Sequence, residues 1–468
     1  MSSGEGLTRQ VARHIAGSRF EQLSPQALRM TRLSLLDAVG VTLAASRLGE
    51  GVAAFADTVA ETGGAAQASV AGFGFKSSIL GAVLVNGAAA HALDFEDAYD
   101  GAPIHPNAAC VPVALALTEH LDLSGQELLT ALAVGCDLVC RLGLALKINP
   151  DEAGWYPPPI LSTFGAAAVG ARLLGLNEDE TVNALALALN QATATAQFKT
   201  APGSTLRSVR DAFPAHAGLL AALLAKRGVL GFDGALEGKA GLFSLFAQGQ
   251  YDPDIILDDL GSRFSGERLS FKPWPSCRGT HAFIEAALAL QREHGFTADE
   301  VEAMVFTGGK VQQMLAEPAA QKSAPKTAID AKFSLPFSTA AALIDGEVTL
   351  ATYGPSRLVD PTILELAARF SYVLDPAATL ADAASGELGL VLRSGRRLHR
   401  RISHPLGAPQ NPMSEQDILA KFTACARLSR RALASEQIRS LSETILTLDR
   451  IERPGGRLAV MAGEADIL

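Results

Sequence analysis

The stretch from His91 to Pro112, HALDFEDAYDGAPIHPNAACVP, gathers acidic side chains and histidines in a short segment. Carboxylates and imidazoles can accept and donate protons at neutral pH, and they can also bind metal ions. Burying them costs on the order of several kcal/mol unless they are paired or hydrogen-bonded. We therefore expect a site here. The six groups are His91, Asp94, Glu96, Asp97, Asp100 and His105.

Spacing within this stretch leaves two interpretations open. His91 and Asp94 are three positions apart and would share one face of a helix. They could form a hydrogen-bonded helix terminus, in which the carboxylates accept from loop amides. They could also ligate a metal, which needs three or four ligands of suitable geometry. Because local spacing supplies only two ligands at a time, the sequence argues against a metal site.

Two apolar helices are expected to position these groups. The small, apolar residues of 78–90 have the size and composition of a buried helix, and a second apolar helix is predicted from about Ala108 to His120. The acid–base groups would then lie between the ends of two core helices.

Length and charge restrict the class of protein. With 468 residues, 48% of them hydrophobic, the chain can form a large core, and two domains are expected. The net charge is 40 − 49 = −9 with the acidic residues dispersed, which argues against nucleic acid and anionic membranes as partners. An anionic substrate would need a local cationic pocket.

Neither the first residues nor cysteine usage indicates export. The segment MSSGEGLTRQ lacks the apolar core of a signal peptide, and the long uncharged runs are broken by Pro, Asn or Gln. The five cysteines are scattered, and the helical pair Cys136 and Cys140 is expected to consist of packed thiols. We expect a reduced, soluble, cytoplasmic protein.

Helical patterns dominate up to about residue 250. Ser24 before Pro25 predicts a capped helix start, and Ser124 with Glu127 is typical of a capping box. Asn177 predicts a further cap. Other helices are expected over about 160–174, 211–227 and 235–247. The first 250 residues are therefore predicted to be all-helical.

The pattern changes near Phe264. Prolines at 273 and 275 exclude a regular helix in SFKPWPSC, and a strand over 301–306 and a hairpin over 388–402 are expected downstream. From Ser414 the helical pattern returns. We predict a mainly α protein: an all-helical domain of 1–265 with 405–468, and an inserted, smaller α+β domain of 266–404.

Several motifs, in order along about residues 7–425, carry a resemblance to the MmgE/PrpD family, which contains dehydratases, decarboxylases and epimerases of small carboxylic acids. They are Asn86-Gly87, His91-Ala-Leu-Asp94-Phe-Glu-Asp97, His105-Pro106, Val111-Pro112, Cys140-Arg141-Leu-Gly143, Phe164-Gly-Ala-Ala167, Lys272-Pro-Trp-Pro-Ser-Cys277 with Thr280-His281, and Lys332-Phe-Ser-Leu-Pro336. The resemblance implies the two-domain fold, a homodimer, and chemistry without a metal or organic cofactor at a cleft between the domains.

Site residues carry over only in part. Asp94, His105 and His281 fall on positions that match the family pattern, whereas four polar positions differ. Ala98 stands where Thr is frequent. Tyr156 and Pro158 stand where the family usually has His and Thr, and Arg207 stands at the usual Lys.

These differences change the chemistry that the site can perform. A buried lysine can act as a base, but an arginine stays charged, so Arg207 is expected to bind a carboxylate or stabilise an enolate. Tyr156 is a poorer base than histidine and a plausible acid. It could equally be a packed loop aromatic.

The resemblance and these residues together predict carbon-acid chemistry on a small di- or tricarboxylate. His281 or His105 would remove a proton next to a carboxylate or carbonyl, with Asp94 as orienting group or partner acid. Arg207, Lys272, Arg278 and His91 are expected to hold the substrate. A lyase is favoured; an epimerase and a non-catalytic, metabolite-binding family member stay open as alternatives.

Overall fold

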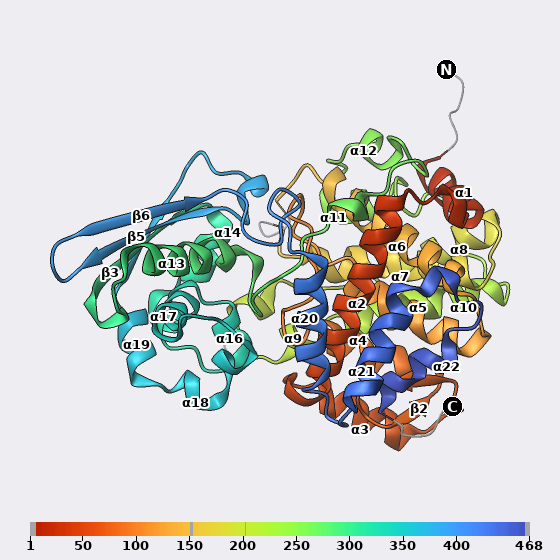
Figure 1. Ribbon diagram of the computed structural model, residues 1–468. Helices are drawn as coiled ribbons and strands as arrows, with labels where there is room; N and C mark the ends of the chain where they lie inside the picture. Colours follow the sequence, from red (N-terminus) through yellow and green to blue (C-terminus); the bar gives the residue numbers. More distant parts are fainter. Residues whose placement is uncertain (1–5, 150–152, 202, 464–468) are drawn as a thin grey trace.

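The computed structural model describes residues 6–149, 153–201 and 203–463 and has two lobes (Figure 1). The larger lobe consists of helices with one small hairpin, and the smaller lobe combines helices with a four-stranded sheet. The predicted fold class, mainly α with a smaller sheet-containing part, is confirmed.

The larger lobe is a stack of apolar helices around one core. Its central members are hydrophobic on nearly all sides, as expected for helices with no solvent face. The N-terminal part of the chain contributes the following helices, of which α4 to α7 are these central members: α1 Leu7–Gly17, α2 Pro25–Leu48, α3 Val52–Thr62, α4 Ile79–His91, α5 Asn107–Leu121, α6 Gly125–Ala145, α7 Pro157–Leu173, α8 Glu178–Leu189, α9 Leu206–Val209, α10 Ala212–Lys226, α11 Leu242–Ala247 and α12 Pro253–Leu257.

The C-terminal helices return to this lobe. α20 (Glu415–Ala426) and α21 (Ser435–Leu446) pack against α2, and α22 (Gly455–Leu458) packs against α5. In Figure 1 these blue helices lie beside the red N-terminal ones. One core draws on residues between Leu7 and Phe271 and between Ile418 and Met461, and a second on residues between Ala282 and Leu398. The exact boundaries at 265 and 405 stay a prediction.

Helix starts follow the predicted caps. The Ser24 hydroxyl accepts from the amide of Ala27, and Ser124 and Asn177 form reciprocal capping boxes with Glu127 and Glu180. α6 is the one helix among the described residues that is long and apolar enough to cross a bilayer. Since 89% of that apolar window is buried within the protein, α6 is a core helix.

Two local predictions in this lobe are wrong. Residues 68–77 form an antiparallel hairpin, β1 (Ala68–Val70) and β2 (Phe75–Ser77), so the lobe is not purely helical. The predicted helix over 235–247 is only α11, because Gly234, with a φ of +77°, starts a tight loop. A Cβ at Gly238 would lie 2.4 Å from the Gly234 carbonyl oxygen, so this loop requires glycine there.

The smaller lobe is built on a sheet with strand order β4-β3-β5-β6. β3 (Val301–Gly308) pairs parallel to β4 (Phe370–Leu374) and antiparallel to β5 (Gly386–Leu392), which forms the predicted hairpin with β6 (Arg397–Ile402). α13 (His281–His294) packs on β5 and β6, and α17 (Leu335–Asp345) packs on α13. The other helices are α14 Lys310–Ala316, α15 Ala319–Ser323, α16 Ala328–Lys332, α18 Pro355–Leu358 and α19 Pro361–Ala367.

Candidate active site

A cavity of about 120 Å³ is lined by residues of both lobes. The helical lobe supplies the segment after α4 and the starts of α7 and α9, and the smaller lobe supplies residues around 278, 311–314 and 383–384. Its charged and proton-carrying wall includes Asp94, His105, Tyr156, Lys199, Arg207 and Arg278.

Three buried lysines hold the segment that follows α4. Lys332 donates to the carbonyl of Leu93 at 2.7 Å, Lys272 to that of Asp94 at 3.0 Å, and Lys421 to that of Phe95 at 2.6 Å. The lysines come from α16, the 269–277 segment and α20, so both lobes and the C-terminal helices contribute. Three successive carbonyls are thus fixed in a backbone turn in which Asp94 has a φ of +48°.

Asp94 is therefore not part of a helical pair with His91. α4 ends at His91, and the turn brings the Asp94 carboxylate to 3.9 Å from His91 Nδ1 and 2.7 Å from Lys272 Nζ. Burial acts to raise the pKa of Asp94, but Lys272 and His91 together hold it down at about 2. Asp94 is consequently an anion at neutral pH.

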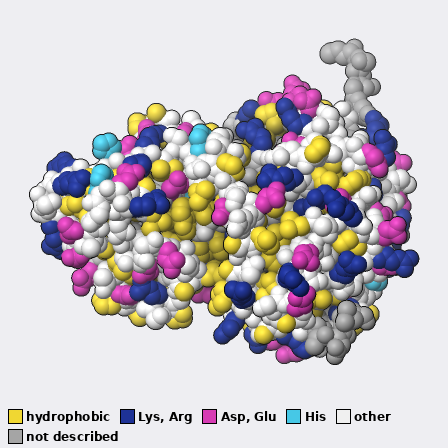
Figure 2. Space-filling model, in the orientation of Figure 1, with side chains coloured by type: hydrophobic (Ala, Val, Ile, Leu, Met, Phe, Trp, Pro, Cys, Tyr) yellow, Lys and Arg dark blue, Asp and Glu magenta, His cyan; other side chains and the backbone are white. Residues whose placement is uncertain are grey.

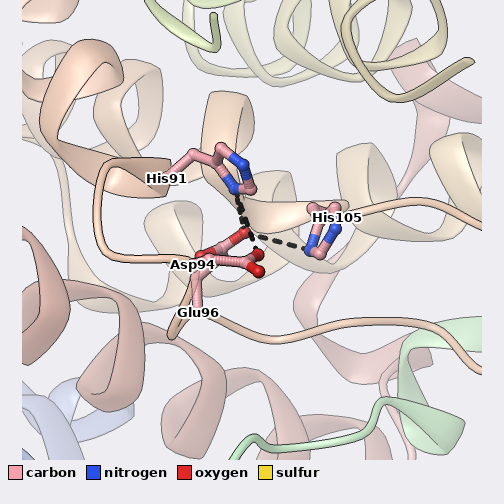
Figure 3. A group of neighbouring side chains, drawn as sticks. All are labelled: His91, Asp94, Glu96 and His105. Carbon is pink, nitrogen blue, oxygen red and sulfur yellow. Dashed lines mark hydrogen bonds and ion pairs between the residues drawn. The ribbon is translucent and has the colours of Figure 1, made fainter. Parts of the chain in front are cut away.

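Glu96 joins His91 and His105 (Figure 3). Its Oε1 is hydrogen-bonded to Nδ1 of His91 and lies 3.0 Å from Nδ1 of His105. Burial would raise the pKa of Glu96, yet His91, Lys272 and His105 keep it well below its usual value. His91 is fully buried, and burial, followed by the nearby Arg210, lowers its pKa. A neutral His91 thus donates to a charged Glu96.

Hydrogen bonding fixes the orientation of His105. Its Nδ1 lies 3.0 Å from both the Glu96 carboxylate and the backbone carbonyl of Asp97. Both partners can only accept, so Nδ1 carries the proton and the Nε2 lone pair is available. Since His105 lines the cavity, this residue meets the requirements of a general base.

Tyr156 and Arg207 lie on another part of the wall. Tyr156 packs edge-on against Phe198, with Lys199 and Arg210 4.7 and 4.9 Å from its ring centroid. The Arg207 guanidinium stacks on Phe333 at 3.3 Å, and its Nε is buried without a hydrogen-bond partner. Burial lowers the pKa of Arg207, but an arginine remains a cation. This cation is exposed to whatever anion enters the cavity.

Arg278 lines the cavity but is occupied. It binds both carboxylate oxygens of Asp100, at 3.0 and 2.9 Å, and the carbonyls of Pro405 and Leu406. Its Nη1 also donates to Nδ1 of His281 at 3.2 Å. These contacts use all five N–H donors of the guanidinium. Arg278 therefore joins the lobes and has no donor left for a substrate carboxylate.

His281 lies behind Arg278 and not on the cavity wall. It is fully buried, its Nε2 donates to the carbonyl of Ser276 at 3.1 Å, and its ring packs edge-on against Trp274. Burial, with Arg278 and Lys272 nearby, lowers its pKa well below the usual value. Both ring nitrogens are engaged, so the expectation that His281 faces the cleft as a base is not met.

Five of the eight predicted site residues line the cavity: Asp94, His105, Tyr156, Arg207 and Arg278. The other three, His91, Lys272 and His281, are buried behind it; His91 and Lys272 contact Asp94, and His281 contacts Arg278. Sequence reasoning did not assign a role to Glu96, Asp100, Lys332 or Lys421. Glu96 and Asp100 lie inside the first candidate stretch and Lys332 inside a quoted motif, but only the fold reveals their partners.

His91, Asp94, Glu96 and His105 place one potential ligand atom each within 4.8 Å of one another, which is compatible in distance with a metal. Their bonding is not compatible. The two Nδ1 atoms point at one Glu96 oxygen, and the Lys272 ammonium binds Oδ1 of the Asp94 carboxylate, with Arg210 3.4 Å from His91. A dication would have to displace or repel these cations. The donor set fits a proton-handling network.

Comparison with known proteins gives matches along nearly the whole chain. The model described as MmgE/PrpD N-terminal domain matches residues 9–254, and the MmgE/PrpD C-terminal domain matches residues 274–446. A cis-aconitate decarboxylase of Mus musculus is 27% identical, covering 96% of this chain and 92% of that protein. A cis-aconitate decarboxylase-like protein of Aspergillus oryzae is 26% identical, covering 85% of each. A 2-methylcitrate dehydratase of Cupriavidus necator is 24% identical, covering 77% and 76%.

Proposed function

Because the chain belongs to the MmgE/PrpD family, we propose that it is a lyase acting on a small carboxylate by proton abstraction at carbon, without a metal or organic cofactor. The relatives named above are decarboxylases and a dehydratase, which favours a lyase over an epimerase. The observation that carries the proposal is one cavity holding both a histidine with a free Nε2 and a buried arginine.

Arg207 binds the carboxylate of the substrate. Its guanidinium lies in an apolar setting against Phe333, where a substrate carboxylate would gain strong, bidentate hydrogen bonds. The same cation stabilises the negative charge that develops on the carboxylate or carbonyl oxygen when the neighbouring carbon loses its proton.

His105 removes this proton. Nε2 accepts it, and the resulting imidazolium is stabilised by the charged Glu96 at its Nδ1 side. Asp94 and Lys272 hold the backbone beneath, so the base is fixed before the substrate arrives. A positioned general base typically contributes about 10²–10⁴-fold to the rate.

Tyr156 is the second proton-carrying group. In a dehydration it would give its proton to the leaving β-hydroxyl, so that one water departs and a carbon–carbon double bond forms. In a decarboxylation, the electron pair of the broken carbon–carbon bond would be protonated at carbon as carbon dioxide leaves. Its place on the cavity wall next to Arg207's partner Phe198 supports this role.

We further propose a homodimer, which the family resemblance implies, and a cytoplasmic location, which rests on the scattered cysteines and the first residues of the sequence. Size-exclusion chromatography with light scattering measures the first.

Deuterium incorporation followed by NMR tests the proposed function. Small di- and tricarboxylates that raise the melting temperature are incubated with the enzyme in D₂O. A lyase gives product with loss of water or carbon dioxide, and His105→Ala abolishes it. Exchange with inversion and no loss would identify an epimerase. Binding without any exchange at carbon would sink the proposal in favour of a metabolite-binding protein.

A further inference from the structure

We propose that the substrate carries an apolar substituent, which is received by Val311 and Met314 of α14 with Ala383 and Ala384. This inference rests on the proposed function, since it concerns the acid that the same cavity accepts. We therefore expect this site to bind a compact tricarboxylate weakly and a small acid with an alkyl branch more tightly.

Charges on the cavity wall cancel one another except around Arg207. Asp94 is paired with Lys272, and Asp100 takes two of the five N–H donors of Arg278, whose others bind carbonyls and His281. Among the described residues, no carboxylate forms an ion pair with Arg207. The wall therefore offers a buried cationic end at Arg207 and two neutralised pairs elsewhere.

Lys199 belongs to this same end. Its ammonium lies 4.7 Å from the Tyr156 ring, Tyr156 contacts Phe198, and the Arg207 guanidinium lies 6.0 Å from Phe198. One or two substrate carboxylates can gather here. A further carboxylate, pointing elsewhere in the cavity, would meet Arg278 and Lys272, whose charges are already paired with Asp100 and Asp94.

Where α14 and residues 383–384 line the cavity, none of the described side chains is charged. Val311, Met314, Ala383 and Ala384 line it together with Gly279, against which Val311 and Ala383 both lie. A carboxylate pressed on this wall would lose hydration without compensation, whereas an alkyl group would gain by leaving water. Met314 adapts its shape readily, so this wall suits branches of several forms. Figure 2 shows apolar side chains also gathered where the two lobes meet on the outer face.

Two ligands of equal shape test the proposal. Tricarballylate and 2-isobutylsuccinate differ only in that a carboxylate of the first is an isopropyl group in the second. Calorimetry on the intact protein should give at least ~10-fold tighter binding of 2-isobutylsuccinate, as expected for one alkyl branch transferred from water. Equal or tighter binding of tricarballylate, or binding of neither, overturns the inference.

Lysine substitutions on the apolar wall, with a control lysine beside it, test which residues receive the alkyl group. Met314→Lys should reverse the preference towards tricarballylate, and Ala383→Lys is the second variant if the first does not fold. Gln313→Lys adds the same charge one residue away on α14 and should leave the preference unchanged. If Met314→Lys and Ala383→Lys both fold and keep the wild-type preference, the wall assignment is wrong.

The two proposals fail differently. Turnover of a tricarboxylate combined with its tighter binding would overturn the apolar wall and keep the lyase. Absence of exchange at carbon for every acid that binds would overturn the lyase, whichever of the two ligands binds more tightly.

Discussion

Lys272 donates hydrogen bonds to both the carbonyl oxygen and the carboxylate of Asp94, at 3.0 and 2.7 Å, and solvent reaches neither side chain. Removing one partner of a buried pair typically costs about 3–5 kcal/mol because the other charge stays buried and unpaired. The lysine here also fixes the turn that carries the catalytic segment. The pair therefore links stability to the geometry of the cavity.

Lys272→Met should lower the melting temperature strongly and abolish turnover. Adding Asp94→Asn removes the orphaned charge, so the double variant should regain much of the stability and none of the activity. Calorimetry and the exchange assay measure the two effects. A double variant no more stable than Lys272→Met would contradict the pairing.

Acid unfolding provides a second measurement of how much the pair of Lys272 and Asp94 contributes to stability. The pKa of Asp94 is about 2 in the folded protein against 3.8 for the free side chain, so its contribution to stability is present above pH 3.8 and is lost as the pH falls towards 2. In Asp94→Asn this loss should be absent from the acid limb of the stability curve.

His105→Ala and His281→Ala distinguish the two candidate bases. His105 lines the cavity with a side chain that is 14% exposed, so its removal should abolish turnover and lower the melting temperature less than loss of a fully buried residue. His281 is fully buried with both nitrogens bonded, so its loss should destabilise the protein by leaving Arg278 and Ser276 with unmet hydrogen bonds. The reverse pattern would reassign the base to His281.

Sequence reasoning predicted the elements whose signals are local. The caps at Ser24, Ser124 and Asn177 depend on residues within one turn, and the apolar run of α4 is readable by itself. The 68–77 hairpin was missed because its strands have only three residues each. The loop before α11 was missed although its signal is local, because Gly234, Gly238 and Gly241, which contact one another, were not read as helix breakers.

The site residues likewise differ in whether a local sequence signal identifies them. Asp94 and His105 were found because they belong to one short acidic stretch. The position of His281 behind Arg278 depends on Asp100, Pro405 and Leu406, which occupy the arginine from distant parts of the chain. The lysines that hold residues 93–95 come from three separate elements, and nothing in their local sequence indicates a common target.

The gain in stability of Asp97→Asn over the wild type should grow as the pH rises. Burial, with Asp37 and Glu96 nearby, raises the pKa of Asp97 to about 8. The folded protein thus keeps a proton that the unfolded chain releases above its usual pKa of 3.8, so wild-type stability falls between about pH 4 and pH 8. Each pH unit in that window is worth up to about 1.4 kcal/mol.

The asparagine variant has no such proton to lose, and its side-chain oxygen can still accept from Asn107, which now donates to Asp97 at 2.9 Å. Melting temperatures of variant and wild type should therefore diverge from pH 4 to pH 8 and stay parallel beyond. A constant difference across this range would show that Asp97 is ionised in the folded state.

Turnover of 2-methylcitrate and cis-aconitate should be slow. Relative to the family pattern, Ala98 has no hydroxyl to donate, and Arg207 cannot exchange a proton as a lysine does. With at least two proton-transfer groups changed, each typically worth about 10²–10⁴-fold, the standard routes lose most of their catalysis. Rates on the order of 1–10³ s⁻¹ for either acid, which are ordinary for enzymes, would contradict this prediction.

Asp100 and Arg278 connect the lobes, and their separation should affect binding before chemistry. The carboxylate comes from the segment after α4 and the guanidinium from the segment before α13, with side chains that are 20% and 9% exposed. Asp100→Asn keeps the shape of the side chain but removes its charge, which frees the arginine from its bidentate partner. Arg278 can then bind a substrate carboxylate in an unproductive position, so KM should change and kcat/KM should fall.

His105 and Glu96 are untouched in Asp100→Asn, so hydrogen–deuterium exchange of the 92–97 amides should stay as in the wild type. Asp382→Asn, at an exposed carboxylate that caps Thr379, is the matched control and should leave both kinetic constants unchanged. Loss of amide protection throughout 92–97 in Asp100→Asn would instead mean that the pair supports the fold of the catalytic segment itself.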